Sequence, residues 1–203
     1  MNSRVKISVV LLLSSALLAV IPLPGKNSLI STPEEVLSTS INESGFLTPD
    51  QVASLIARSD STFQLIDVRT QQEFNLSSIP GAINLPLSDL LKSGILSVLP
   101  GDNIRKIFYS NGDLEANLAL VAVAGYGLKN VAVMKGGLNC WFENIMLSSF
   151  SGDKITPEQN ALFETRYKAR RLFTEINSLP DSLKNKGLDA RKFNRKKLDG
   201  GCE

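Results

Sequence analysis

Residues able to act as strong nucleophiles or bases are scarce in this chain of 203 residues. It has two cysteines, Cys140 and Cys202, and no histidine. The lack of histidine excludes a Ser-His-Asp triad, a Cys-His dyad and a histidine-ligated metal. Two cysteines are too few for a four-cysteine zinc site or a disulfide scaffold. We therefore expect no metal and no cofactor, and the two thiols are the strongest candidate nucleophiles.

The sequence leaves the roles of both cysteines open. Cys140 follows a Gly-Gly pair and precedes Trp141, so it is either a reactive thiol near a helix start or a small buried side chain packed beside that tryptophan. Cys202 follows Gly-Gly near the end of a basic stretch. It is a candidate swinging thiol carrier, a disulfide partner for Cys140 or for another chain, or a residue without a role.

Strand-like and helical patterns alternate between residues 47 and 146. The expected strands are Phe63–Val68, Ala82–Leu85, Ile104–Tyr109 and Asn130–Met134. One helix is expected to start at Thr48, and a weak helical turn is expected at Ser88–Leu91. Two further helices are expected at Glu115–Ala124 and Pro157–Ile176. This alternation predicts an α/β fold with a mainly parallel sheet flanked by helices on both faces. In such sheets, functional residues gather at the C-terminal ends of the strands.

Two blocks in this region resemble a known family. The first runs from Asp67-Val68-Arg69 to Asn84, and the second from Gly127 to Trp141. Together they resemble the signature of rhodanese-like domains, which have the sulfurtransferase fold, over about residues 47–146. The positions that carry the resemblance are Asp67, Arg69, Glu73, Pro80, Gly81, Asn84, Gly136, Gly137 and Trp141. We expect them to form scaffold. Arg69 should form an ion pair with Asp67 or Glu73, and Pro80-Gly81 should form a turn.

The resemblance also implies a catalytic cysteine after the fourth strand of the family's sheet, at the start of a loop whose N–H groups face the sulfur. A count without gaps from Gly127 and Gly136 places this position at Ser110. The degenerate loop comprises Ser110, Asn111, Gly112, Asp113, Leu114 and Glu115. Serine cannot form a persulfide, and Glu115 stands where the family often has a basic residue. The family's Gly-His pair is replaced by Ser77-Ser78. We therefore expect neither thiosulfate sulfurtransferase activity nor the Cys-dependent phosphatase activity found on the same fold.

The two ends of the chain differ from its body. Residues 7–25 carry no charge and follow Arg4 and Lys6, which predicts a signal peptide or membrane anchor with the body on the exported, periplasmic or extracytoplasmic side. Residues 26–46 predict a linker, 47–148 the rhodanese-like domain, and 149–203 a helix with a basic flexible tail. The tail is suited to contact anionic lipid, and its single aromatic side chain, Phe193, argues against nucleic acid.

Three functions fit these observations. The first is a binding or regulatory module that recognises a protein or small ligand at the Ser110–Glu115 loop. The alternative is a thiol or persulfide relay that uses Cys202, Cys140 or both. The third is a structural spacer at the membrane.

Overall fold

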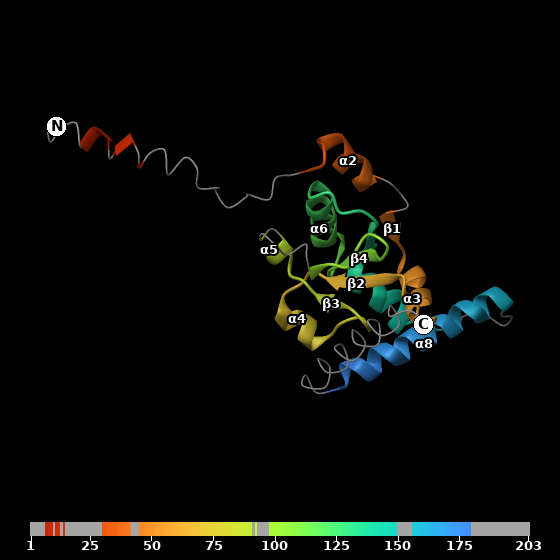
Figure 1. Cartoon of the computed structure of the whole chain (residues 1–203). Coiled ribbons are helices and arrows are strands. Elements are labelled where there is room, and N and C mark those ends of the chain that lie inside the picture. The colour runs from red at the N-terminus through yellow and green to blue at the C-terminus, as the bar shows by residue number, and fades with distance from the viewer. Residues whose placement is uncertain are drawn as a thin grey trace, which may run out of the picture.

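The computed structural model describes residues 7–9, 11, 12, 14, 30–41, 45–90, 92, 98–149 and 156–179 of the chain. Its centre is a five-stranded parallel sheet in the order β1-β5-β4-β2-β3 (Figure 1). The strands are β1 (Phe46–Leu47), β2 (Phe63–Asp67), β3 (Ile83–Asn84), β4 (Arg105–Tyr109) and β5 (Val131–Met134). Asp67 pairs in register with Asn84 on one side and with Tyr109 on the other, so these three residues share the C-terminal edge of the sheet.

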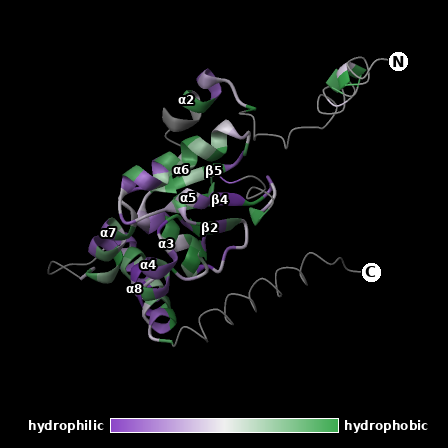
Figure 2. Ribbon diagram, turned by 90° about the vertical axis from the view of Figure 1, so that its left-hand side faces the viewer, coloured by the Kyte–Doolittle hydropathy of each residue, from purple (hydrophilic) through white to green (hydrophobic). Residues whose placement is uncertain are grey.

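Helices cover both faces of the sheet, as the sequence predicted (Figure 2). The helices are α2 (Pro33–Ile41), α3 (Pro49–Ala57), α4 (Gln71–Leu76), α5 (Leu87–Leu90), α6 (Asp113–Gly125), α7 (Gly137–Trp141), the π-helix η3 (Phe142–Met146) and α8 (Pro157–Asn177). One hydrophobic core joins Leu65 and Ile107 of the strands to α3, α4, α7, η3 and α8. The other joins Ile66, Phe108 and Val133 to α5 and α6. Alternate strand residues therefore face opposite cores, which is the period of two that a strand imposes.

The sequence predicted the starts of α3 and α8, but not those of α4 and α2, which also begin with capping boxes. Thr48 and Gln51 form both bonds of a capping box at α3, and Thr156 and Gln159 do the same at α8. Helix α6 begins two residues earlier than we expected, at Asp113, because Gly112 serves as its N-cap without a capping side chain. Strand β1 was not predicted, since two residues are too short to give an alternating pattern.

The expected linker at residues 26–46 requires a correction. Residues 33–41 form α2, which packs against α6, and the backbone amides of Ile30 and Ser31 both donate to the carbonyl of Gly125, at 2.9 and 3.2 Å. This part of the chain is therefore docked on the domain, although its Ser-rich and Glu-rich composition suggested an extended spacer.

The prediction of a hydrophobic helix at residues 7–25 gains no support from the structure. Of this segment, only residues 7–9, 11, 12 and 14 are described, and they are helical. Within the described ranges, none of the helices combines the length and the apolar character needed to cross a bilayer. The predicted tail from residue 180 onward, with Cys202, lies outside the described residues.

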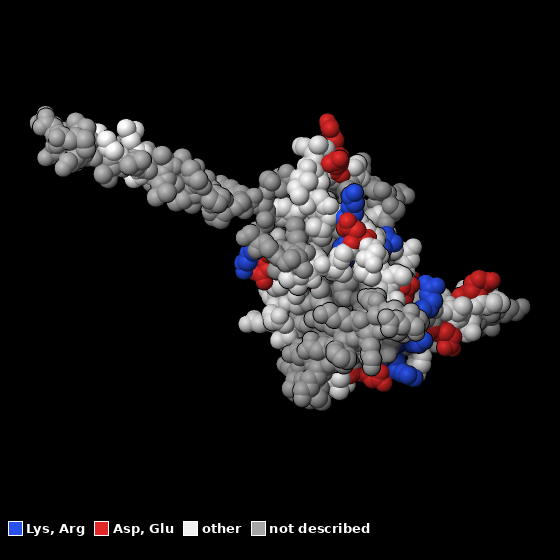
Figure 3. Space-filling view, viewed as in Figure 1, with Lys and Arg blue, Asp and Glu red and all other residues white. Residues whose placement is uncertain are grey.

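Helix α8 was expected as part of a C-terminal extension, but it shares the core of the domain. Its buried residues Ala169 and Phe173 belong to the same core as Trp141, whose ring centroid lies 6.4 Å from that of Phe173. Arg166 holds the Asp50 carboxylate through two bonds of 2.6 and 2.7 Å. Acidic and basic side chains alternate along its outer surface in the view of Figure 3. Apolar burial and the Arg166–Asp50 ion pair therefore both hold α8 on the domain.

We predict that Phe173→Ala lowers the free energy of unfolding by about 3–5 kcal/mol, because it removes a large buried side chain and leaves a cavity. Chemical denaturation of the full chain measures this loss. Tyr167→Ala on the same helix is the matched control, since Tyr167 is 50% exposed. An equal loss in both variants would show that α8 does not share the core.

Candidate functional site

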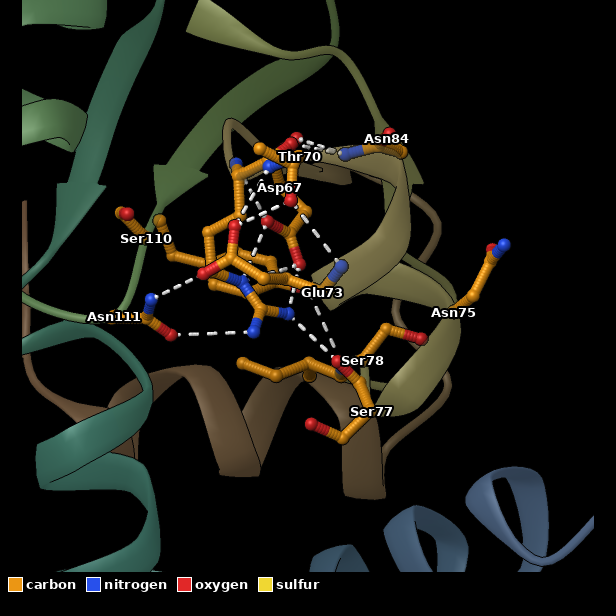
Figure 4. Close-up of polar contacts among 12 residues, drawn as sticks. Asp67, Thr70, Glu73, Asn75, Ser77, Ser78, Asn84, Ser110 and Asn111 are labelled. Atoms are coloured by element: carbon orange, nitrogen blue, oxygen red, sulfur yellow. Dashed lines mark hydrogen bonds and ion pairs between the residues drawn. The ribbon is translucent and has the colours of Figure 1, made fainter.

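The candidate site lies at the C-terminal edge of the sheet, where three segments converge. Asp67 ends β2, Ser110 follows β4, and Gly136-Gly137 follow β5. All strands are parallel, so these ends meet at one edge, as the sequence analysis predicted. Figure 4 shows the polar side chains that gather there.

A buried ion pair forms the base of the site. Arg69 Nη2 lies 2.6 Å from Asp67 Oδ2, and Arg69 Nε lies 3.0 Å from Asp67 Oδ1. The side chains of Asp67 and Arg69 are 0% and 4% exposed. Burial lowers the pKa of the Arg69 guanidinium, but the hydrogen bonds and charge of Asp67 outweigh it, so the net shift is upward and the group stays charged. The predicted pairing of Asp67 with Arg69 is confirmed.

The guanidinium of Arg69 also holds two other segments in place. Its Nη2 donates to the carbonyl of Ser77 at 2.7 Å, and its Nη1 donates to Asn111 Oδ1 at 3.3 Å. The Asn84 amide donates to the carbonyls of Asp67 and Arg69, at 3.1 and 2.8 Å. Arg69 therefore joins β2, the end of α4 and the loop after β4 (Figure 4).

Glu73 acts mainly as a helix cap and does not pair directly with Arg69. Its Oε2 accepts from the amide and hydroxyl of Thr70, which completes a capping box at α4. Its Oε1 accepts from Asn111 Nδ2 at 2.9 Å. The hydrogen bonds from Thr70, followed by that from Asn111, lower the pKa of the Glu73 carboxyl. Of the two acids named for the ion pair, Glu73 is therefore not the partner of Arg69; the Asn111 amide stands between them.

The phenol of Tyr109 closes the inner side of the site. It is fully buried and accepts a hydrogen bond from the amide of Ile79 at 3.2 Å. Burial, together with the nearby Asp67 carboxylate, raises the pKa of Tyr109 well above its ordinary value. The phenol therefore stays neutral and serves as a structural contact.

Ser110 lies at the bottom of the loop and is 1% exposed. Its hydroxyl donates to the Glu115 carboxylate, which extends back from the first turn of α6. The Asp113 carboxylate accepts from the amide of Gly136 at 2.5 Å. Both acids lie in the first turn of a 13-residue helix, where the helix dipole favours negative charge. The loop thus places two carboxylates of its own at the N-terminus of α6, the end of the helix that attracts anions.

The Gly136-Gly137 pair allows β5 and α7 to approach this loop closely. A Cβ on Gly137 would lie 2.3 Å from the carbonyl oxygen of Ser110, and its φ of 52° disfavours other residues. The amides of Leu138 and Asn139 donate to the carbonyls of Ser110 and Asn111, at 2.9 and 3.0 Å. These bonds fix the loop backbone against the start of α7.

Cys140 lies beside the site but not at a helix start. Its amide donates to the carbonyl of Gly136 within α7, and its Sγ rests against Gly136, where a Cβ would come within 2.0 Å of the sulfur. Cys140 forms no disulfide with another described residue and is half-buried, whereas Trp141 is fully buried in the core. Cys140 is therefore not fully buried beside Trp141, as one of the two alternatives for it required. Pairing with Cys202 stays a prediction.

The remaining motif residues play structural roles. Pro80-Gly81 form a turn in which Gly81 has a φ of 81°, and Trp141 packs in the core. The sequence reasoning missed Thr70, Tyr109 and Asn177, whose side chains bond to the site or to the segment next to it. The Thr70-to-Glu73 spacing was a visible capping signal, but no local pattern marks Asn177. Among the described residues, no group of three or more His, Cys, Asp and Glu side chains is arranged to hold a metal.

We predict that Asp67→Asn destabilises the fold by about 3–5 kcal/mol, because it leaves a buried guanidinium without its anion. Urea unfolding gives the value. Asp50→Asn is the matched control, since it breaks another two-bond Asp–Arg pair whose side chains are 31% and 24% exposed. We expect a loss of about 1 kcal/mol or less there, and equal losses in the two variants would contradict the dominance of the buried pair.

The lowered pKa of Glu73 predicts a pH effect. A carboxyl with a lowered pKa in the folded state contributes stability above its ordinary value of 4.5, and this contribution is lost as the pH falls through the folded value. Glu73→Gln should therefore flatten the acid limb of the stability curve below pH 4.5. Thermal melts across this range measure the slope. An unchanged slope would show that the Thr70 and Asn111 bonds do not favour the ionised form.

Three comparisons relate the chain to known proteins. The family model for the rhodanese-like domain matches residues 48–144. The chain is 30% identical over 93 residues to the adenylyltransferase and sulfurtransferase UBA4 of Meyerozyma guilliermondii, which covers 42% of this chain and 22% of that protein. It is 23% identical over 151 residues to a probable 3-mercaptopyruvate sulfurtransferase of Schizosaccharomyces pombe, which covers 66% of this chain and 51% of that protein. The chain thus spans about a fifth and about half of the lengths of these curated relatives.

Solved structures were compared as well. A rhodanese-related protein from Thermoplasma volcanium matches at 21% identity and a TM-score of 0.41, over 48% of this chain and 89% of that chain. The family model identifies the central part of the molecule. Residues 48–144 of this chain form a rhodanese-like domain.

Proposed function

We propose that this protein is a binding or regulatory module built on the rhodanese-like fold and that it does not transfer sulfur from thiosulfate. The observation that carries this proposal is Ser110, which lies after β4 with its hydroxyl bonded to the carboxylate of Glu115. A hydroxyl is a far weaker nucleophile than a thiolate unless a base activates it. A carboxylate is a weak base toward an alcohol, so Ser110 is a poor nucleophile.

The charges of the loop argue against an anionic substrate. Asp113 and Glu115 are exposed and both lie beside the position that a sulfur donor would approach. Two like charges 4 Å apart repel by about 1 kcal/mol in water and about 4 kcal/mol near a protein surface. The same carboxylates, with the exposed side chain of Leu114, favour a partner that presents a cationic group next to an apolar one.

A thiol relay is the second candidate, because Cys140 is half-buried next to the loop and is not in a disulfide within the described part of the chain. Its Sγ touches Gly136, whose amide is bound by Asp113. A relay requires at least one thiol, whereas the binding module requires none. Incubation with a persulfide donor, followed by intact-mass analysis of the wild type, Cys140→Ser and Cys202→Ser, separates the two. A gain of one sulfur atom that is lost in one variant would support the relay.

Export and membrane association belong to the same proposal and rest on the sequence of residues 7–25. The uncharged run after Arg4 and Lys6 is typical of a signal peptide or an anchor. Membrane fractionation of the full chain, with a variant that carries two lysines within this run, provides the test. Equal recovery of both proteins in the soluble fraction would contradict it.

For the loop itself, we predict the order of thiosulfate:cyanide turnover in four proteins. The wild type should show none, and Ser110→Cys should show little. Ser110→Cys with Glu115→Ala should show at least about tenfold more than Ser110→Cys, because removal of about 1.4 kcal/mol of repulsion changes a rate tenfold. Ser110→Cys with Glu164→Ala, which removes an exposed acid from α8, is the matched control. The proposal would be overturned if the wild type turned over thiosulfate and a variant without Cys140 and Cys202 kept this activity.

Binding is tested with a tetralysine peptide as the probe. Amide signals of residues 110–115 in the full chain should shift on titration, and Asp113→Asn with Glu115→Gln should abolish the shifts by removing the negative charge. A tetraglutamate peptide is the control for charge. Shifts of these signals with tetraglutamate instead of tetralysine would contradict the proposed ligand chemistry.

A further inference from the structure

The last residue of α8 binds the backbone of the segment that adjoins the candidate site. Asn177 Oδ1 accepts from the amide of Ser78 at 2.9 Å, and Asn177 Nδ2 donates to the carbonyl of the same residue at 2.9 Å. Asn177 Nδ2 also donates to the carbonyl of Phe173 at 2.8 Å, which fixes the side chain on its own helix. One amide group thus satisfies both backbone groups of Ser78, a residue that is 6% exposed.

Ser77, the residue before Ser78, is in contact with Arg69. Ser77 ends α4 in an extended conformation, with φ of −158° and ψ of 136°, so residues 77 and 78 lie outside the helix. The carbonyl of Ser77 accepts from Arg69 Nη2 at 2.7 Å. Because Ser77 and Ser78 are adjacent, any shift of the Ser78 backbone moves this acceptor.

Arg69 also bonds to the loop after β4. Its Nη1 donates to Asn111 Oδ1, and Asn111 Nδ2 donates to Glu73. A continuous series of hydrogen bonds therefore runs from α8 through the Ser77-Ser78 backbone and Arg69 to the Ser110–Glu115 loop. Figure 4 shows the part of this series between Ser77 and Asn111. The C-terminal part of α8 is itself anchored, since Phe173 is buried one turn before Asn177 and Arg170 donates to the carbonyl of Ser148 at 2.6 Å.

We propose that Asn177 is a positioning residue for the site: α8 holds Ser77-Ser78 in place and thereby sets the orientation of Arg69 and of the Asn111 side chain in the loop. Helix α8 lies outside residues 48–144, which match the family model. The description of the loop as a binding site rests on the proposed function, whereas the positioning by Asn177 does not.

The test compares Asn177→Ala with the matched control Asn160→Ala, an exposed asparagine in the first turns of the same helix. Nuclear magnetic resonance of the full chain follows the Ser78 amide, the Arg69 Nε–H and the Asn111 side-chain amide. We expect Asn177→Ala to raise the exchange rate of the Ser78 amide at least about tenfold relative to the Phe108 amide of β4, because a buried donor loses its acceptor. The Arg69 and Asn111 signals should shift in Asn177→Ala and stay unchanged in Asn160→Ala.

The comparison with Phe108 removes the effect of global stability, which a purely structural role would produce at both amides. If Asn177→Ala does not fold, Asn177→Asp takes its place, since it keeps an acceptor for the Ser78 amide and loses the donor to the Ser78 carbonyl. Faster exchange at Ser78 with unchanged Arg69 and Asn111 signals would overturn the proposal, as would equal shifts in the Asn160 variant. A loop that binds no tetralysine would refute the proposed function alone, because these signals require no ligand.

Discussion

The buried ion pair between Asp67 and Arg69 is the constraint on which the site depends. Taking both charges out of water is costly, and only close geometry with further hydrogen bonds compensates for that cost. The structure provides such bonds to the guanidinium from two other segments, the end of α4 and the loop after β4. The requirement to satisfy one guanidinium therefore brings together segments that are far apart in the sequence.

The loop next to this pair combines a closely packed backbone with acidic side chains. The Gly136-Gly137 pair permits close approach, and two amides of α7 donate to the carbonyls of Ser110 and Asn111. The acidic side chains in the first turn of α6 are Asp113 and Glu115. The side chains of such a loop, and not the fold alone, decide what it can bind.

Helix α8 links the stability of the domain to the geometry of its site. Phe173 contributes to the main core, and Asn177, four residues later, bonds to the backbone beside Arg69. Four residues are about one helical turn, so both side chains point to the same side of α8. The burial of Phe173 therefore places Asn177 beside Ser78. A helix outside residues 48–144 thus contacts both the core and the site.

The sequence by itself determined the fold class, the starts of α3 and α8, an ion pair at Arg69 and the position of Ser110 after β4, because these depend on local patterns or nearby residues. It did not reveal that Glu115 bonds to Ser110, that Asn111 stands between Arg69 and Glu73, or that Asn177 binds Ser78, 99 residues away. Nor did it predict that residues 33–41 form a helix docked on α6. Only tertiary structure decided these contacts, since each needs a donor and an acceptor from distant segments to meet within about 3 Å.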